Sequence, residues 1–594
     1  MTESPTPAAD IQEWCEHFAA ALAAQDVDAS ASLFEPDGFW RDLLCFTWNL
    51  VTLEGRDAIA DMLHRCIARA GSSAWRVEAA PGAQEGWLHF ETIDARGTGY
   101  VRLRNGRAFM LLTAMIELKG HEEARGRRRP LGLVPDPQGQ GRSWGERRAE
   151  ARSASLDSAA PEVLIVGASQ AGLALGARLK ALGVPTLLVD KLPRIGDQWR
   201  SRYRSLVLHD PVWYDHLPYL PFPDTWPVYT PKDKIADFLE HYASIFELDV
   251  ATGTACEHAA YDAAAGHWSV SVRREDETVT LTPRQLVFAV GNAGFPRIPE
   301  FPGARDFHGP QLHSSAYRGN EAVSGKRVVV IGSNNSAHDI CADLVERGAE
   351  PVMIQRSSTL VVRSQIVYEW LNKPLYSEEA LAAGFTTERA DLYAASVPLR
   401  LLEQAHVKVW QAIAEADRTF YDSLRQVGFM LDFGEDGTGM YCKYLRSASG
   451  YYIDVGASAM IADGRIGLRS RVGVEAIEAD AVRLTSGERV PADMIVYATG
   501  FGSMEEWAST LISPNAAATL GRCWGYGSGA AGDPGPWQGE INNMWKPTPV
   551  DGLWFQGGNL AQSRHYSKYL ALQLQARMLG LAVEVYDPRR PIAP

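Results

Sequence analysis

Two glycine turns, each joining a short apolar strand to a helix, constrain the fold of this 594-residue chain more than any other feature. The first strand, Val163 to Val166, leads into Gly167-Ala-Ser-Gln-Ala-Gly172, and the second, Arg327 to Ile331, leads into Gly332-Ser-Asn-Asn-Ser-Ala337. Glycine permits the tight turn, and the N-terminus of the helix that follows faces a pyrophosphate. Two such units predict two dinucleotide sites, and therefore an enzyme that passes electrons from one dinucleotide to another.

The residue that ends the second strand of each unit indicates which dinucleotide is bound. Asp190 follows the strand from Thr186 to Val189, at the position where a carboxylate binds a ribose hydroxyl. In the second unit the corresponding strand, Pro351 to Ile354, is followed by Gln355-Arg356-Ser357-Ser358, with no acid. A carboxylate would repel a 2′-phosphate, whereas Arg356 and the adjacent hydroxyls can bind one. This pattern predicts NADPH at the second unit; the alternative is that Arg356 is a solvated loop cation.

Composition and cysteine usage exclude several classes of protein. The chain carries 58 Lys and Arg against 72 Asp and Glu, a formal charge of −14, so no nucleic-acid or anionic-membrane partner is expected. Its seven cysteines are scattered and form no Cys-x-x-Cys pair, which favours a reducing cytoplasm and supports neither a disulfide framework nor a metal site. The N-terminus lacks the pattern of a signal peptide and no run of 18 apolar residues exists, so we expect a cytoplasmic protein without a membrane span.

Residues 1–119 are expected to form a small α+β domain, followed by a linker over 120–160. Apolar residues at helical spacing predict helices over 11–25 and 56–70, and alternating stretches predict strands near 87–92 and 108–117. The linker is rich in Arg, Gly, Pro and Ser, with a short helix predicted over 144–153. The order of elements in the first domain resembles the SnoaL-like, nuclear-transport-factor-like superfamily of cone-shaped α+β domains.

Four further motifs follow one another between residues 161 and 585. They are Gly196-Asp-Gln198-Trp199-Arg200, Phe307-x-Gly309-x-x-x-His313-x-x-x-Tyr317, the strand from Asp493 to Phe501, and Gly557-Gly-Asn559 before a final helix. In this order they resemble the class B flavin-dependent monooxygenases. There the first segment packs on the flavin, the second is the family fingerprint, the third links the two dinucleotide domains and the fourth closes over the flavin ring. Tyr317 departs from the fingerprint, which usually ends in Phe or Trp. With the N-terminal domain, the resemblance extends to the bacterial type II flavin monooxygenases.

The resemblance implies an α/β fold with two Rossmann-like domains, the NADPH domain inserted in the FAD domain. FAD is expected to be bound by residues 161–321 and 496–594, and NADPH by residues 322–495. A mostly helical stretch of the insertion, 369–432, either covers the substrate entrance or pads the domain. The cofactor-binding residues that the motifs and the resemblance indicate are Gly167, Ser169, Gln170, Ala171, Gly172, Asp190, Lys191, Gln198, Trp199, Gly332, Asn334, Asn335, Ser336, Arg356, Thr499, Gly500 and Asn559.

The chemistry that the resemblance implies is the oxygenation of a small organic molecule by O2. NADPH reduces FAD, oxygen adds to the reduced flavin to give a 4a-(hydro)peroxide, and one oxygen atom passes to the substrate while water is excluded. Baeyer–Villiger oxidation of ketones is the first expectation. The alternatives are N- or S-oxygenation of soft nucleophiles and an indole-3-pyruvate-type decarboxylating reaction.

Rival classes differ from this interpretation in testable ways. A disulfide reductase is rejected because the required cysteine pair is absent from the sequence. An NADPH oxidase that releases hydrogen peroxide would not couple NADPH use to product. A non-enzymatic ligand-binding or dimerising module with a degenerate reductase would bind no flavin. A homodimer is one option for assembly.

His209 and Asp210 are the candidate catalytic residues. The resemblance aligns His209 with a position beside the flavin where many members carry Asn. There it would donate a hydrogen bond to the flavin peroxide or anchor NADP⁺, with Asp210 orienting it. The alternative is a structural histidine that caps the loop. His313 of the fingerprint is expected to be a hydrogen bonder between domains rather than an acid–base catalyst.

Overall fold

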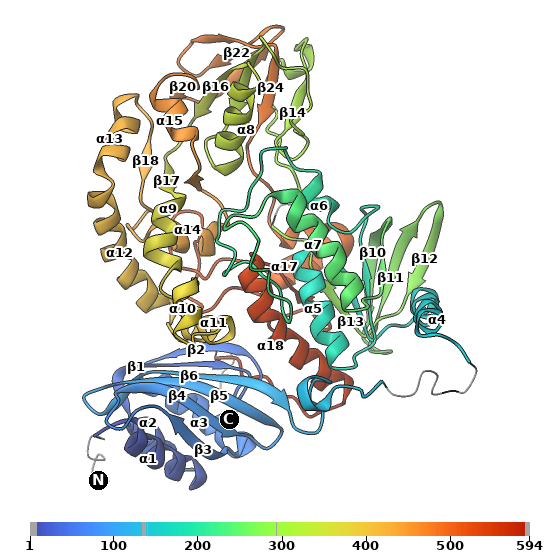
Figure 1. Ribbon diagram of the computed structural model, residues 1–594, viewed down its shortest axis with the longest axis vertical. Helices are drawn as coiled ribbons and strands as arrows, with labels where there is room; N and C mark the ends of the chain where they lie inside the picture. Colours follow the sequence, from blue (N-terminus) through green and yellow to red (C-terminus); the bar gives the residue numbers. More distant parts are fainter. Residues whose placement is uncertain (1–8, 133–137, 139–140, 293, 589–594) are drawn as a thin grey trace.

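The computed structural model describes residues 9–132, 138, 141–292 and 294–588. Figure 1 shows an N-terminal unit at the bottom of the molecule, one parallel-sheet unit at the right and another at the top. A layer of helices between residues 364 and 462 runs down the left side from the upper unit to the N-terminal unit. The units are therefore joined around a common centre, where helix α18 lies.

The N-terminal unit is a six-stranded sheet in the order β2-β1-β6-β5-β4-β3, with helices α1 and α3 in contact with it. Neighbouring strands are antiparallel except β1 and β6, which pair in parallel. Helix α1 buries Ile11, Trp14 and Phe18, the apolar face that its helical spacing predicts. The predicted helices and strands are present, and the elements are α1 Ile11–Ala23, α2 Val27–Ser32, β1 Phe34–Leu43, β2 Leu50–Glu54, α3 Arg56–Ala70, β3 Ser73–Glu78, β4 Glu85–Glu91, β5 Ala95–Arg104 and β6 Arg107–Leu118.

The segment after the N-terminal unit contains a short 3-10 turn, η1 Gly126–Arg128, and the predicted helix, α4 Trp144–Asp157. A capping box between Ser143 and Glu146 begins α4. Arg148 anchors this helix to the first parallel-sheet unit, because its guanidinium donates to the Asp249 carboxylate at 2.8 Å.

The first parallel sheet has the order β25-β13-β7-β8-β9, and every neighbouring pair is parallel. All four residues of β7 are buried, as expected for a strand of a sheet with both faces covered. Helix α18 packs along α5, and a small antiparallel sheet, β10-β11-β12, adjoins β13. The elements are β7 Val163–Val166, α5 Gln170–Ala181, β8 Thr186–Val189, α6 Asp197–Arg200, α7 Lys232–Ile245, β9 Val250–Ala251, β10 Thr254–Asp262, β11 His267–Arg274, β12 Glu277–Leu281, β13 Gln285–Phe288, β25 Leu553–Phe555 and α18 Leu560–Met578.

The second parallel sheet has the order β14-β24-β15-β16-β20 and is likewise parallel throughout. Its strands lie in the sequence between β13 and β25 of the first sheet, so the second unit interrupts the first. The elements are η2 Ala304–Asp306, β14 Gln311–His313, β15 Arg327–Ile331, α8 Asn335–Glu346, β16 Glu350–Gln355, β20 Gly467–Ser470, β21 Val474–Glu478, β22 Ala481–Leu484, β23 Arg489–Pro491, β24 Met494–Tyr497, α16 Glu505–Leu511 and α17 Pro514–Leu520.

The stretch 369–432, predicted to be mostly helical, is largely helical in the structure. It begins within a π-helix, a rare form that often occurs at functional sites. Together with the strands that flank it, it forms the layer between the second parallel sheet and the N-terminal unit. The elements are β17 Thr359–Arg363, α9 Ser364–Val367, η3 Tyr368–Asn372, α10 Glu378–Ala382, α11 Thr387–Ala395, α12 Leu399–Ala416, α13 Arg418–Gln426, β18 Leu431–Asp432, α14 Gly439–Ser447, β19 Tyr451–Asp454 and α15 Ala457–Ala462.

The described residues lack both membrane-spanning helices and metal-binding clusters. Within the described ranges, none of the helices combines the length and apolar character needed to cross a bilayer. The described side chains also contain no group of three His, Cys, Asp or Glu placed to hold a metal ion.

Candidate functional site

The first glycine turn leaves no room for side chains at its two glycines. Gly167 has φ +107°, and a Cβ added there would lie 2.5 Å from the Ala289 carbonyl oxygen. A Cβ at Gly172 would lie 1.9 Å from the carbonyl oxygen of Gly167. Strand β7, the turn and the start of α5 are therefore in backbone contact, which brings the helix N-terminus close to the edge of the sheet.

Helix α5 begins without a side-chain cap, although a serine occupies the capping position. The Ser169 hydroxyl donates to the Gln170 side-chain oxygen at 2.7 Å instead of accepting from the first-turn amides. Trp199 of α6 donates its indole N–H to the same Gln170 oxygen at 3.3 Å. The first turn of α5 thus keeps backbone donors for an anion, as phosphate sites at helix N-termini require.

Asp190 ends β8 beside this turn and accepts two backbone hydrogen bonds. Its oxygens accept from the amides of Ala168 at 2.8 Å and Leu192 at 2.9 Å. Each carboxylate oxygen has a further lone pair, so bracing the turn and binding a ribose hydroxyl are compatible. Of the neighbouring predicted residues, Lys191 places its ammonium 5.9 Å from the Trp507 ring centre, and Gln198 is exposed on α6.

The second glycine turn opens onto a cleft of about 770 Å³. A Cβ at Gly332 would lie 2.2 Å from the Ala498 carbonyl oxygen, so this turn is as tightly packed as the first. Asn334 does not cap α8, which again leaves first-turn donors free. The cleft brings together the predicted residues Gly332, Asn334, Asn335, Ser336, Arg356, Thr499 and Gly500.

Arg356 lies in this cleft as a free cation. It is exposed, as is Ser357 beside it, and both line the cleft. No described carboxylate lies within ion-pair distance of Arg356. By contrast Arg297, which also lines the cleft, is paired with Glu506 at 2.7 Å. Arg356 is therefore the cation best placed to receive an added anion.

His209 and Asp210 are adjacent in the sequence and interact electrostatically, because burial raises the pKa of Asp210 and the nearby His209 opposes that shift. The His209 Nε2 lies 3.9 Å from the Asp339 carboxylate of α8, and the Tyr203 hydroxyl donates to the same carboxylate at 2.5 Å. Burial raises the pKa of Asp339, and the nearby His209 opposes that shift. The carboxylate within ion-pair distance of His209 is thus Asp339, and the expected orienting role of Asp210 stays a prediction.

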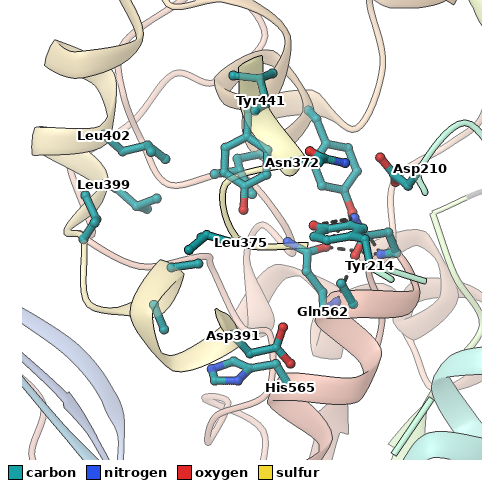
Figure 2. A pocket seen from close by; sticks show the side chains of 18 of the residues that line it. Asp210, Tyr214, Asn372, Leu375, Asp391, Leu399, Leu402, Tyr441, Gln562 and His565 are labelled. Atoms are coloured by element: carbon teal, nitrogen blue, oxygen red, sulfur yellow. Dashed lines mark hydrogen bonds between the residues drawn. The ribbon is translucent and has the colours of Figure 1, made fainter. Parts of the chain in front are cut away.

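Asp210 faces a second cavity, of about 350 Å³, shown in Figure 2. Leu375, Leu399 and Leu402 lie on one side of this cavity, and Asp210 and Tyr214 lie on the other. The helical stretch 369–432 therefore lines a cavity, and it is not mere padding. Further aromatic side chains complete the lining, namely Tyr376, Tyr393, Tyr441, Tyr444, Tyr451, Trp545 and Tyr566.

A hydrogen-bond network at the start of α18 forms part of the wall of this cavity. Asn559 caps α18 through the Gln562 amide at 2.9 Å and donates its side-chain amide to the Tyr214 hydroxyl at 3.2 Å. The Tyr444 hydroxyl donates to the Gln562 side chain at 2.5 Å. Tyr451 lines both the cavity and the cleft of the second turn, so the two spaces adjoin each other.

The fingerprint residues support the connection between the segments rather than a reacting group. His313 of β14 contacts the Gly500 carbonyl oxygen through Nε2 at 3.0 Å and the Ser315 hydroxyl through Nδ1 at 2.9 Å. Tyr317 donates to the Asp343 carboxylate of α8 at 2.6 Å. Both ring nitrogens of His313 are thereby engaged, as its expected linking role requires.

Comparisons with known proteins identify the family. Residues 164–421 match the pyridine nucleotide-disulphide oxidoreductase family model. Over 344 residues the chain is 30% identical to the probable indole-3-pyruvate monooxygenase YUCCA1 of Arabidopsis thaliana, covering 57% of this chain and 75% of that protein. The chain belongs to the class B flavin-dependent monooxygenases. It is also 39% identical to the indole-3-pyruvate monooxygenase YUCCA1 of Oryza sativa over 203 residues, 34% of this chain but only 49% of the rice protein.

Solved structures of flavin monooxygenases have a similar fold. A cyclohexanone monooxygenase bound to ε-caprolactone superimposes with a TM-score of 0.51 at 16% identity, covering 71% of this chain and 88% of that one. A steroid monooxygenase bound to NADP gives a TM-score of 0.50 at 18% identity, with 71% and 85% covered. At these identities the likeness concerns the fold alone, and it confirms the α/β class with Rossmann-type units.

Membership of the family confirms several sequence predictions. The protein is an oxidoreductase, and flavin monooxygenases use FAD and NADPH, the predicted cofactors. The seven cysteines all lie in the described residues and are free thiols. No two of them form the disulfide after which the matched family is named. Sequence reasoning missed the tyrosine-lined cavity, because its residues are distributed from position 41 to position 566 with no local pattern.

Proposed function

We propose that this flavin monooxygenase carries out Baeyer–Villiger oxidation of ketones. One atom of O2 is inserted between the carbonyl carbon and an adjacent carbon to give an ester, the other atom leaves as water, and NADPH supplies the two electrons. The observation that carries the proposal is the cavity of about 350 Å³, lined by leucine and tyrosine, which adjoins the cleft of the second glycine turn. A mostly apolar wall suits oxygen transfer to a carbonyl compound, because this reaction requires that water be excluded.

A second candidate is an indole-3-pyruvate-type decarboxylating oxygenation. It is favoured by the similarity to plant indole-3-pyruvate monooxygenases, at 30–39% identity. Both candidates use the same cofactors and differ in whether the substrate carries a carboxylate.

The cofactor assignment follows the two glycine turns. The uncapped N-terminus of α5, with Asp190 bracing the turn, fits the pyrophosphate and ribose of FAD, and residues 161–321 and 496–594 would hold it. The uncapped N-terminus of α8 and Arg356 fit NADPH, which residues 322–495 would hold. Bound FAD supplies the redox chemistry with oxygen. The protein's own part is to bind and orient both dinucleotides and to keep the cavity free of water.

The N-terminal unit supports assignment to the type II subgroup. Its mixed sheet and three helices suit the SnoaL-like α+β domain over 1–119, joined by a linker over 120–160. In this proposal the domain is a structural part of the enzyme rather than a separate ligand-binding module.

The test of the proposed function is NADPH consumption together with product mass, across a panel of ketones and sulfides. The purified protein should be yellow because of its bound flavin. Each ketone should give a product about 16 mass units heavier, since one oxygen atom is added per turnover. Sulfides as the sole productive substrates would favour heteroatom oxygenation. Absence of flavin absorbance after reconstitution with FAD would end the proposal.

Arg356→Ala should raise the Michaelis constant for NADPH far more than that for NADH. A charge-assisted pair to the 2′-phosphate contributes about 1.5–3 kcal/mol, or roughly one to two powers of ten. Steady-state kinetics with both coenzymes gives the measurement. Arg297→Ala is the matched control, because this cation of the same cleft is paired with Glu506 and should discriminate less between the coenzymes. Equal losses for both coenzymes in Arg356→Ala would show that Arg356 does not bind the phosphate.

His209→Ala should leave anaerobic flavin reduction by NADPH nearly intact but divert electrons from product to hydrogen peroxide. His209 lies between the first parallel-sheet unit and Asp339 of α8, where it would act as a positioned donor. Loss of one such donor typically costs about 10²-fold where charge develops, so uncoupling should be readily measurable as peroxide per NADPH. His209→Asn, which restores an amide donor, should recover part of the coupling. Unchanged coupling in the alanine variant would make His209 a purely structural residue.

A further inference from the structure

We propose that the 350 Å³ cavity admits uncharged ketones and excludes carboxylates, because Arg41 from the N-terminal unit, the one permanent cation among the described residues that line it, is already neutralised by Glu540. This inference rests on the proposed function, since it takes the cavity to be the substrate site. It makes Arg41 and Glu540 determinants of specificity, and it separates the two candidate reactions by the charge of their substrates.

Arg41 has almost no capacity left for a ligand. Its guanidinium forms a bidentate pair with Glu540, with both N···O distances 2.7 Å. It also donates to the Ala395 carbonyl oxygen at 2.7 Å and to the Tyr566 hydroxyl at 3.1 Å. Four of its five N–H donors are thereby used. Burial disfavours its charge, but Glu540 raises the pKa of Arg41 above its ordinary value, so the guanidinium stays charged.

The other basic groups that line the cavity are two neutral histidines. Burial lowers the pKa of His406 to about 4 and that of His565 to about 3. Both imidazoles are therefore uncharged near neutral pH. They offer a carboxylate no compensating charge.

The guanidinium of Arg564, behind the cavity wall, is also occupied by hydrogen bonds within the protein. It pairs in bidentate fashion with Asp391 at 2.8 Å, and its Nη1 donates to the carbonyl oxygens of Tyr214 and His216. Burial alone would raise the pKa of Asp391, but the charge and hydrogen bonds of Arg564 hold it below its ordinary value. This wall therefore presents a second neutralised ion pair, of which Asp391 is the member that lines the cavity.

The polar groups that remain suit a neutral carbonyl. The side-chain amide of Asn372, at the end of the π-helix, is buried in the cavity wall beside the Asp210 carboxyl, whose pKa its hydrogen bond lowers, so one of its two N–H groups is left for a ligand. The His565 Nε2 is also buried and has no hydrogen-bond partner. An amide N–H can donate to a ketone oxygen at little desolvation cost, whereas a carboxylate that left water here would lack a countercharge.

The test compares two ligands with the same ring. Indole-3-pyruvate and indole-3-acetone differ only in a carboxylate and a methyl group on the ketone. Their binding to the oxidised holoenzyme with NADP⁺ is measured by isothermal titration calorimetry, which requires no turnover. Indole-3-acetone should bind about tenfold or more tightly than indole-3-pyruvate, a difference of about 1.4 kcal/mol. Equal or tighter binding of indole-3-pyruvate, or saturation by neither ligand, would overturn the proposal.

Glu540→Gln tests the role of the ion pair. It keeps the side-chain shape but leaves Arg41 uncompensated beside the cavity, so indole-3-pyruvate should bind about tenfold more tightly than to the parent. The control is Glu54→Gln, which removes an ion pair of the same interface, with Arg400, from a position outside the cavity lining. Unchanged affinity in a Glu540→Gln variant that retains flavin would contradict the assigned role. Because loss of one partner of a buried pair is destabilising, the comparison on the parent enzyme stands by itself.

The same experiments distinguish failure of the Baeyer–Villiger assignment from failure of the charge selection. If indole-3-acetone binds preferentially but yields no oxygenated product while NADPH is consumed, the Baeyer–Villiger assignment fails and the charge selection holds. If indole-3-pyruvate binds preferentially and loses CO2, the charge selection fails and the second candidate reaction is supported.

Discussion

Gly172→Ala is expected to yield protein without bound flavin and with NADPH-dependent activity at least about 100-fold below the parent, since a shift of about 1 Å in a binding constellation can cost that much. The added methyl group would lie 1.9 Å from the Gly167 carbonyl oxygen, and backbone cannot give way as a flexible side chain can. The turn must therefore open. The first-turn donors of α5 would then no longer converge on one anion. Flavin absorbance of the purified protein and NADPH oxidation in air give the measurement.

The control for this variant lies on the same helix. A Cβ at Gly176 meets the ends of two flexible side chains, Leu188 at 3.1 Å and Leu248 at 3.6 Å, and these side chains can adjust. Gly176→Ala should therefore retain flavin. It lowers the conformational entropy of the unfolded chain by the same amount as Gly172→Ala, because both replace glycine by alanine. Flavin retained at parental occupancy in Gly172→Ala would show that this turn does not hold the FAD pyrophosphate.

The glycine-turn units could be predicted from the sequence because every signal for them is local. Strand β7 coincides with the predicted Val163 to Val166, and β15 with Arg327 to Ile331. Helix α3 begins and ends at the predicted Arg56 and Ala70. A buried strand, a glycine that only a tight turn tolerates and a helix follow one another within a few residues, so periodicity and turn chemistry agree.

The cavity could not be predicted in this way, because its walls meet only in the folded chain. Arg41 and Glu540 are 499 residues apart, and neither stands in a motif. The leucines and tyrosines of the lining come from helices, from strand β19 and from turns, and the local sequence pattern of each does not show what lies opposite it. The helical stretch was therefore predicted correctly, while its contribution to a cavity was left open.

The same limit explains the interpretation of His209. The resemblance suggested that Asp210 orients His209, and the two residues lie together in a bend, where His209 opposes the effect of burial on the pKa of Asp210. A second carboxylate, within ion-pair distance of His209, comes from α8 of the other parallel-sheet unit. This tertiary contact adds to the local one, and no spacing rule in the sequence could have indicated it.

Arg41→Met is expected to destabilise the holoenzyme by about 3–5 kcal/mol, because it leaves Glu540 as an unpaired charge in the protein interior. The two side chains are only 9% and 5% exposed, and their pair joins β1 of the N-terminal unit to the segment before β25. Arg400→Met, at the same interface, removes an ion pair with Glu54 whose side chains are 41% and 26% exposed, and should cost about 1 kcal/mol or less.

Denaturant unfolding of the holoenzyme, followed by flavin release and tryptophan fluorescence, measures both variants under one condition. The double variant Arg41→Met/Glu540→Gln should recover much of the loss, because the cost comes from the uncompensated charge rather than from the absent contact. Recovery would also show that contacts other than this ion pair hold the N-terminal unit in place, since Asn49 and Asp61 are hydrogen-bonded to Tyr586 and Glu54 accepts from Trp537. If Arg41→Met lowered the free energy of unfolding no more than Arg400→Met, the buried pair would not anchor the N-terminal unit. Another donor would then have to compensate the Glu540 carboxylate, and the Thr52 hydroxyl already donates to it at 2.7 Å.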